Sequence, residues 1–171
     1  MSNVKRVYVE KKSGFDEPKT IEAMEMIENI IKDGSMPDYT VLSENDSTAL
    51  MEAGTVAMTF QGSWSIPELA GNDYVKENCD IAPLPNGPEG TKSIYNGLGW
   101  AASANSENPE GAWKLIEYLG SKEAQEKQAN LGVTMSAYEG TSDTWVNSQP
   151  GFNMQAYLDM REDAQAYPSS K

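Results

Sequence analysis

The stretch that decides the fold is ENDSTALMEAGTVAMTFQGSW, residues 44–64. Residues 44–52 follow the candidate cap Ser43 and predict a short helix that ends before Gly54. The run after this glycine, residues 55–60, is rich in β-branched and apolar side chains and predicts a buried strand. A helix, a glycine and a buried strand form an α/β unit, so this stretch favours an α/β domain.

The end of the quoted stretch predicts a turn. Gly62 and Ser63 interrupt the strand, and Ser63 is a candidate cap for a short helix that carries Trp64 in its first turn. The pattern therefore places Trp64 at the junction between two elements. Because Trp64 is flanked by a glycine at an element boundary, we interpret it as a candidate binding residue rather than a core residue.

Helical periodicity continues on both sides of this stretch. Apolar spacing, caps and stop signals predict further helices at residues 19–33, at 109–120 after the cap Asn108, at 122–131 after the cap Ser121, and at 153–166. Short strands are predicted at residues 4–10, 79–82, 93–95 and 98–103, and a proline- and glycine-rich loop at 83–90. The order of elements predicts a mixed sheet flanked by helices. Because 171 residues fall within the range of one domain, residues 1–171 are expected to form a single domain.

The composition excludes several classes of partner. A formal net charge of −13 argues against a nucleic-acid ligand and against adsorption to an anionic membrane surface. No apolar run approaches the roughly 20 residues that span a bilayer. Cys79 is the single cysteine, and its neighbours suit an inert, core-filling thiol. The sequence therefore predicts a chain without nucleic-acid or membrane contacts, and a monomer.

The residue types also limit the chemistry. The chain has no histidine, which removes the usual nucleophilic triads and the commonest zinc ligands. A glycosidase-type carboxylate pair stays open, although most acidic residues fit solvated helix faces. Gly97 and Gly99 resemble part of a dinucleotide motif, but no helix opens after them. We therefore expect no catalytic residue, no metal and no cofactor.

Aromatic residues stand out in the turn-rich segments. Trp64 and Trp100 both follow glycines at element boundaries, which favours a binding role, since aromatic faces stack on the apolar faces of sugar rings. Trp113 lies inside an amphipathic helix and is predicted to be a core residue. The sequence leaves Trp145 undecided. We expect Trp64 and Trp100 to line the same concave surface.

Four separate motifs then resemble those of the family 1 extracellular solute-binding proteins, the maltose-binding-protein-like group. They occur in the family's order and cover about residues 19–138. The motifs are MEAGTVAM with GSW (residues 51–58 and 62–64), DIAPLPNGPEG (80–90), the glycine-rich NGLGWAA (96–102), and NPEGAWKLIEYL with SKEAQ (108–119 and 121–125). One position departs from the family, because Thr134-Met135-Ser136 stands where Pro-x-Arg is common, which puts an arginine contact there in doubt.

This resemblance implies a fold and a function. The chain is expected to be the carboxyl-proximal lobe of a periplasmic-binding-protein type II-like fold, with the other lobe, a signal peptide and the last helices outside residues 1–171. The family implies a carbohydrate ligand in a cleft between two lobes, delivery to the membrane permease subunits of an ABC importer, and an extracytoplasmic location, in the periplasm or as a lipoprotein. The ligand-binding residues that it implies are Trp64, Trp100, Asn96, Gly97 and Gly99, with Gln61 and Tyr138 as weaker candidates.

Two other functions stay open at this point. A carbohydrate-active enzyme domain would turn over an oligosaccharide, and a non-catalytic interaction domain would bury its tryptophans as core. A sugar receptor would instead be stabilised by its ligand without turnover.

Overall fold

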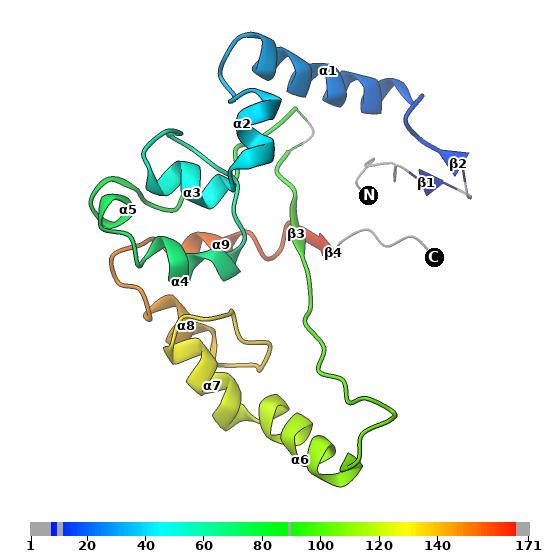
Figure 1. The fold of residues 1–171 in the computed structure, drawn as a ribbon, viewed down its shortest axis with the longest axis vertical. Coiled ribbons are helices and arrows are strands. Elements are labelled where there is room, and N and C mark those ends of the chain that lie inside the picture. Colours follow the sequence, from blue (N-terminus) through cyan, green and yellow to red (C-terminus); the bar gives the residue numbers. More distant parts are fainter. Residues whose placement is uncertain (1–7, 10–11, 89, 167–171) are drawn as a thin grey trace. The chain divides into compact units, whose positions relative to one another are not determined.

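The computed structural model describes residues 8–9, 12–88 and 90–166 (Figure 1). The described residues form two compact units, one up to residue 47 and one from residue 48 to residue 166. All of the predicted ligand-binding residues lie in the second unit.

The first unit contains a short hairpin and two helices. Strands β1 (Tyr8–Val9) and β2 (Lys12–Ser13) pair antiparallel, with Tyr8 opposite Ser13. Of the strand predicted at 4–10, residues 4–7 and 10 lie outside the described residues. Helix α1 (Pro18–Lys32) confirms the helix predicted at 19–33. It starts with proline in its first turn, where no hydrogen-bonding N–H is needed, and it ends before Gly34, whose φ is +80°.

Two short helices lie in and before the range predicted as one helix at 44–52. Helix α2 (Tyr39–Glu44) is capped by Asp38, whose carboxylate accepts a hydrogen bond from Val41 N at 3.0 Å. It ends at Asn45, which has extended backbone angles and donates from its side chain to Val41 O at 2.9 Å. A new helix, α3 (Ser47–Glu52), then follows. The prediction therefore covered α3 but began it three residues early, and it missed α2 because the cap at Asp38 was not recognised.

Helices are the main regular structure of the second unit. After α3 come the 3₁₀ turn η1 (Ser63–Ser65), α4 (Ile66–Leu69), α5 (Asp73–Asn78), α6 (Pro109–Gly120), α7 (Lys122–Asn130), α8 (Ser142–Val146) and α9 (Gln155–Asp159). The short helix predicted after Gly62 and the helices predicted at 109–120 and 122–131 are confirmed. Helices α5 and α8 were not predicted.

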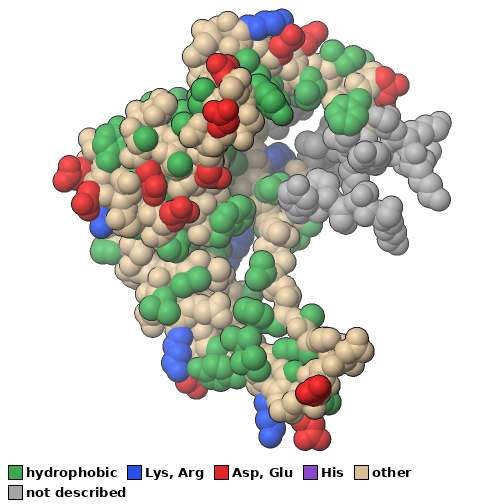
Figure 2. Space-filling model, in the orientation of Figure 1, with side chains coloured by type: hydrophobic (Ala, Val, Ile, Leu, Met, Phe, Trp, Pro, Cys, Tyr) green, Lys and Arg blue, Asp and Glu red, His purple; other side chains and the backbone are tan. Residues whose placement is uncertain are grey.

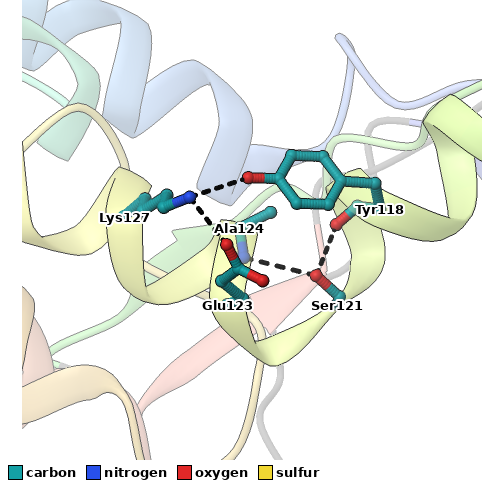
Figure 3. Close-up of polar contacts among 5 residues, drawn as sticks. All are labelled: Tyr118, Ser121, Glu123, Ala124 and Lys127. Carbon is teal, nitrogen blue, oxygen red and sulfur yellow. Dashed lines mark hydrogen bonds and ion pairs between the residues drawn. The ribbon is translucent and has the colours of Figure 1, made fainter.

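The junction between α6 and α7 shows how local signals specify these helices (Figure 3). Asn108 caps α6 by accepting a hydrogen bond from Gly111 N at 2.9 Å. Ser121 ends α6 by donating to Tyr118 O at 2.6 Å, and it starts α7 by accepting from Ala124 N at 3.3 Å. Across the junction, Lys127 Nζ lies 2.7 Å from a Glu123 oxygen and 3.1 Å from the Tyr118 hydroxyl. Caps that act within four residues are readable from sequence.

The β-structure of the second unit is smaller than predicted. Strand β3 (Ser93–Tyr95) confirms one short strand and runs parallel to β4 (Ala164–Ala166), with Ile94 opposite Gln165 (Figure 1). The strands predicted at 55–60, 79–82 and 98–103 are wrong, because these residues are irregular and pair with none of the described residues. The helix predicted at 153–166 is partly wrong, since α9 ends at Asp159 and the last residues of the range form β4.

The core of the second unit gathers around Trp145. This side chain is completely buried and packs with Ile66, Ala129 and Met154. Its ring meets that of Tyr157 edge to face, with centroids 5.8 Å apart and an angle of 74°. Among the described buried atoms, Trp145 Nε1 has no hydrogen-bond partner. The core therefore joins α4, α7, α8 and the segment that leads into α9.

The fold class is confirmed in its coarse form. The chain mixes helices with a small parallel sheet. The larger mixed sheet flanked by helices is not formed by the described residues, which hold one antiparallel and one parallel pair of strands. Sheets need long-range partners, and these cannot be inferred from a local pattern.

Candidate functional site

Trp64 occupies a turn that holds its indole in a defined place. Gly62 precedes η1 with φ −82° and ψ 161°, and the indole of Trp64 lies against the backbone of this glycine. A Cβ atom added to Gly62 would lie 2.2 Å from Cη2 and Cζ3 of the indole. The side chain of Trp64 is nevertheless 67% exposed. The turn therefore presents an aromatic surface to solvent while its glycine supports the ring.

The residues on both sides of Trp64 fix this turn to the core. Ser65 and Ile66 are buried, and Ile66 belongs to the cluster around Trp145. Ser65 Oγ donates to Gln61 Oε1 at 3.1 Å, and Gln61 Nε2 donates to Thr48 Oγ1 at 3.2 Å. The exposed indole is thus carried by a backbone with little freedom to move. We call residues 61–66 the Trp64 turn.

A third contact ties the Trp64 turn to a distant helix. The hydroxyl of Tyr157, on α9, donates to the backbone oxygen of Gln61 at 3.2 Å. Burial raises the pKa of Tyr157 above its ordinary value, so the hydroxyl keeps its proton as a donor. Gln61 was predicted as a weaker ligand-binding residue. In the structure its amide oxygen and nitrogen serve Ser65 and Thr48, which makes it a support for Trp64.

The second group of predicted residues forms an exposed segment. Asn96, Gly97, Gly99 and Trp100 follow β3 in a stretch that is neither helix nor strand, and all four are exposed. Trp100 is 49% exposed. A Cβ atom added to Gly97 or Gly99 would meet nothing within 4 Å. These glycines therefore provide no close approach to any described residue.

Tyr138 lies in a third place, the loop between α7 and α8. It is 44% exposed, its N–H donates to Ser136 Oγ at 3.2 Å, and its carbonyl accepts from Thr141 Oγ1 at 2.7 Å. Gln125 Oε1 accepts from Ser136 Oγ at 3.1 Å and from Ala137 N at 3.3 Å. The loop that replaces the family's Pro-x-Arg is thus held by serine, threonine and glutamine side chains.

The structure brings Gln61 and Trp64 together and makes Asn96 to Trp100 one continuous segment. Trp64, Trp100 and Tyr138 are not in ring contact, because the aromatic contact among the described rings is that of Trp145 with Tyr157. Both Trp64 and Trp100 are exposed, so neither is a core residue. That they line one concave surface stays a prediction.

The other two tryptophans have positions that the sequence did not predict. Trp113 was predicted to be core and is 59% exposed, so this prediction is wrong. It lies in a shallow hollow on α6 with Pro109, Glu110, Lys114 and Glu117, and no residue of α6 is buried. Trp145, which the sequence left undecided, is the centre of the core. Exposed hydrophobic side chains of this kind are visible over the face shown in Figure 2.

A groove beside the parallel strands was missed by sequence reasoning. It has a volume of about 410 Å³, and its lining residues are Ser93, Ile94, Tyr95, Met135, Tyr157, Met160, Arg161 and Ala164. Arg161 lies two residues beyond the end of α9, so no helix periodicity links it to Tyr157. The strand partner of β3, seventy residues away, could not have been found locally.

The described residues hold no cluster of three or more metal-ligating side chains. Cys79 is free and half-buried, so the core-filling role is only partly met. None of the helices in the described part of the chain is long and apolar enough to cross a membrane.

Comparison with known proteins identifies the family of this chain. A protein of Brucella abortus (strain 2308), provisionally named a binding protein, is 27% identical over 165 residues, which are 91% of this chain and 38% of that protein. A protein of Deinococcus radiodurans named a probable ABC transporter-binding protein is 29% identical over 117 residues, 66% of this chain and 27% of that protein. The chain thus spans less than half the length of these relatives.

The family described as bacterial extracellular solute-binding protein matches residues 5–126, including the Trp64 turn and the segment that carries Trp100. This match covers well over half of the chain. The chain therefore belongs to the bacterial extracellular solute-binding protein family.

Proposed function

We propose that this chain is part of the substrate-binding component of an ABC importer, and that it binds a mono- or oligosaccharide with Trp64 as a stacking residue. The observation that carries the proposal is the exposed indole of Trp64, which lies on Gly62 in a turn anchored to the core. Family membership supports solute binding, and the relative in Deinococcus radiodurans supports the link to an ABC transporter.

The geometry of the Trp64 turn suits a sugar better than a peptide or a metal. One side of the indole rests on glycine backbone and the rest is open to solvent, which offers a flat apolar surface to the C–H face of a pyranose ring. Because the ring is already positioned, the ligand loses little binding free energy in ordering it. Asn96, Gly97, Gly99, Trp100 and Tyr138 are proposed as further lining residues that contact hydroxyl groups and ring faces.

We further propose that residues 1–171 form one lobe of a two-lobed monomer. The relatives are more than twice as long as the chain, which leaves room for a second lobe. In such a protein the lobes close over the ligand about a hinge, and the closed form docks on the membrane permease. The location would be extracytoplasmic, in the periplasm or at the cell surface as a lipoprotein, in line with the family's description as extracellular.

Catalysis is not part of this proposal. The family is one of binding proteins, and the chain offers no histidine as a general base. The full-length protein is expected to release no reducing sugar from an oligosaccharide above a buffer control. Turnover that disappears on substitution of one carboxylate would replace the receptor by an enzyme.

The experiment that tests the proposal is a calorimetric titration of the full-length protein and of residues 1–171 against one panel of mono- and oligosaccharides. Micromolar affinity corresponds to about −8 kcal/mol, so a lobe that keeps half of the contacts should bind with a dissociation constant near a millimolar or weaker. We expect micromolar binding by the full-length protein and little by residues 1–171. If neither binds any sugar, the ligand class is wrong. Micromolar binding by residues 1–171 alone would show that the site is not shared between lobes.

A further inference from the structure

The groove beside β3 and β4 is built on the core. Met135 and Tyr157, which line it, also pack against the buried cluster around Trp145. Tyr95 and Ile94 extend from β3 at its edge and are 59% and 58% exposed. The groove therefore has a fixed apolar and aromatic floor with room for a small ligand.

Charge distinguishes this groove from the rest of the surface. The chain has 26 acidic and 13 basic residues, yet none of the residues that line the groove is acidic. The groove's one charged side chain is that of Arg161. An unopposed guanidinium in a strongly acidic chain favours an anionic group within its reach.

Arg161 is, like Lys92 and Lys114, a cation that forms no ion pair with the described residues. Lysines 19, 32, 76, 122 and 127 each lie within 4 Å of an acidic side chain three or four residues away on the same helix. Among the described residues, no carboxylate forms an ion pair with Arg161, and its side chain donates no hydrogen bond. Its five N–H donors are thus available to a ligand.

Tyr157 connects the groove to the Trp64 turn. Its ring lines the groove, while its hydroxyl donates to Gln61 O at 3.2 Å, one residue before the glycine that supports the indole. The groove and the Trp64 turn therefore share Tyr157 as a structural residue.

We propose that this groove is a subsite for a sugar unit that carries a carboxylate, such as a hexuronate, with Arg161 binding the carboxylate. A guanidinium matches a carboxylate with two parallel hydrogen bonds, and the tyrosines and methionines suit the apolar face of the ring. This inference rests on the proposed sugar-binding function and narrows its ligand to acidic sugars.

The test uses the full-length protein and titration calorimetry with D-galacturonate and D-glucuronate, alongside their neutral parents D-galactose and D-glucose. We expect at least one uronate to bind about tenfold or more tightly than its neutral parent, with an affinity that falls as salt is added. Arg161→Gln should remove this preference, whereas Arg161→Lys, which keeps the charge, should retain part of it. Because the Arg161 side chain is exposed and unbonded, the thermal unfolding midpoint of both variants should match that of the wild type.

The outcomes separate the two proposals. Equal affinity for uronates and neutral sugars, or a preference that survives Arg161→Gln, would overturn the subsite and leave the sugar receptor standing. Tighter binding of galactose 6-phosphate than of galacturonate would overturn the carboxylate assignment. If no sugar of either kind binds, the proposed function itself fails, and the subsite with it.

Discussion

The Trp64 turn and the segment that carries Trp100 share a motif of glycine before tryptophan, but they differ in what the glycines do. At Gly62 a Cβ atom would lie 2.2 Å from the indole, so the absence of a side chain is what lets the ring lie there. At Gly97 and Gly99 the same atom would meet nothing within 4 Å. Neither Gly97 nor Gly99 has a positive φ. One glycine therefore serves a contact inside the structure, and the other two do not.

The two segments also differ in how many contacts hold them to the rest of the described chain. The Trp64 turn is held by buried neighbours and by three hydrogen bonds through Gln61 and Ser65. The residues from Asn96 to Ala102 are exposed throughout and form no regular structure. We interpret the open glycines of that segment as positions that a ligand or another part of the full-length protein approaches.

The largest expected effect tests the anchoring of the Trp64 turn. Ile66 is 3% exposed within the core cluster, so Ile66→Ala should lower the free energy of unfolding of residues 1–171 by about 2–5 kcal/mol. Leu98 is 83% exposed in the other segment, and Leu98→Ala should change it by less than about 0.5 kcal/mol. Urea unfolding measures both. A loss above about 1 kcal/mol for Leu98→Ala would mean that the exposed segment has a packing partner in solution.

The next effect concerns the glycine that supports the indole. Gly62→Ala should lower sugar affinity of the full-length protein about tenfold, or roughly 1.4 kcal/mol, because the indole must leave its position. The indole can swing into solvent, so the free energy of unfolding should change by less than about 1 kcal/mol. Gly120→Ala, where a Cβ atom has open space, is the matched control and should leave calorimetric affinity unchanged. Unchanged affinity for Gly62→Ala would mean that the support of the ring does not matter for binding.

The smallest effect is expected for the link between α9 and the Trp64 turn. Tyr157→Phe removes one hydrogen bond to Gln61 O and should lower the free energy of unfolding by about 1 kcal/mol at pH 7. Burial raises the pKa of Tyr157, so the folded state holds this proton at a pH where the unfolded state has released it. Stability should therefore be constant with respect to this group below pH 10 and fall as the pH rises through the folded-state pKa.

Tyr157→Phe is also the control for the predicted loss of stability at high pH. Urea unfolding between pH 9 and pH 11 should show a steeper loss of stability for the wild type than for Tyr157→Phe. Equal slopes for the two proteins would mean that the Tyr157 hydroxyl is not held in a buried environment.

The parts of the fold that depend on neighbouring residues could be predicted from the sequence. Asn108 and Ser121 cap α6 and α7 as expected, because a cap acts within three residues. The strands at 55–60, 79–82 and 98–103 could not be judged in this way, since a strand exists only if a distant segment pairs with it. The partner of β3 is β4, in a range where the periodicity predicted a helix.

The candidate site, like the fold, has parts that local sequence predicts and parts that depend on long-range packing. The position of Trp64 at the start of a short helix followed from the glycine and serine that precede it, which is local information. The prediction for Trp113 was wrong and Trp145 was left undecided, because burial depends on which elements cover a helix face. Tyr157 and Arg161 line the groove together with residues of β3, which are far away in the sequence. Tyr157 also donates a hydrogen bond to Gln61 O. No local motif predicts either position.

The measurement that tests the central claim most directly is the sugar affinity of the full-length protein with Trp64→Ala, compared with Trp113→Ala. The two side chains are similarly exposed, at 67% and 59%, so both variants remove an exposed indole at little cost in stability. Removing a stacking residue should weaken calorimetric binding about tenfold to a hundredfold for Trp64→Ala, while Trp113→Ala binds as the wild type does. Wild-type affinity in Trp64→Ala, or an equal loss in both variants, would contradict the account.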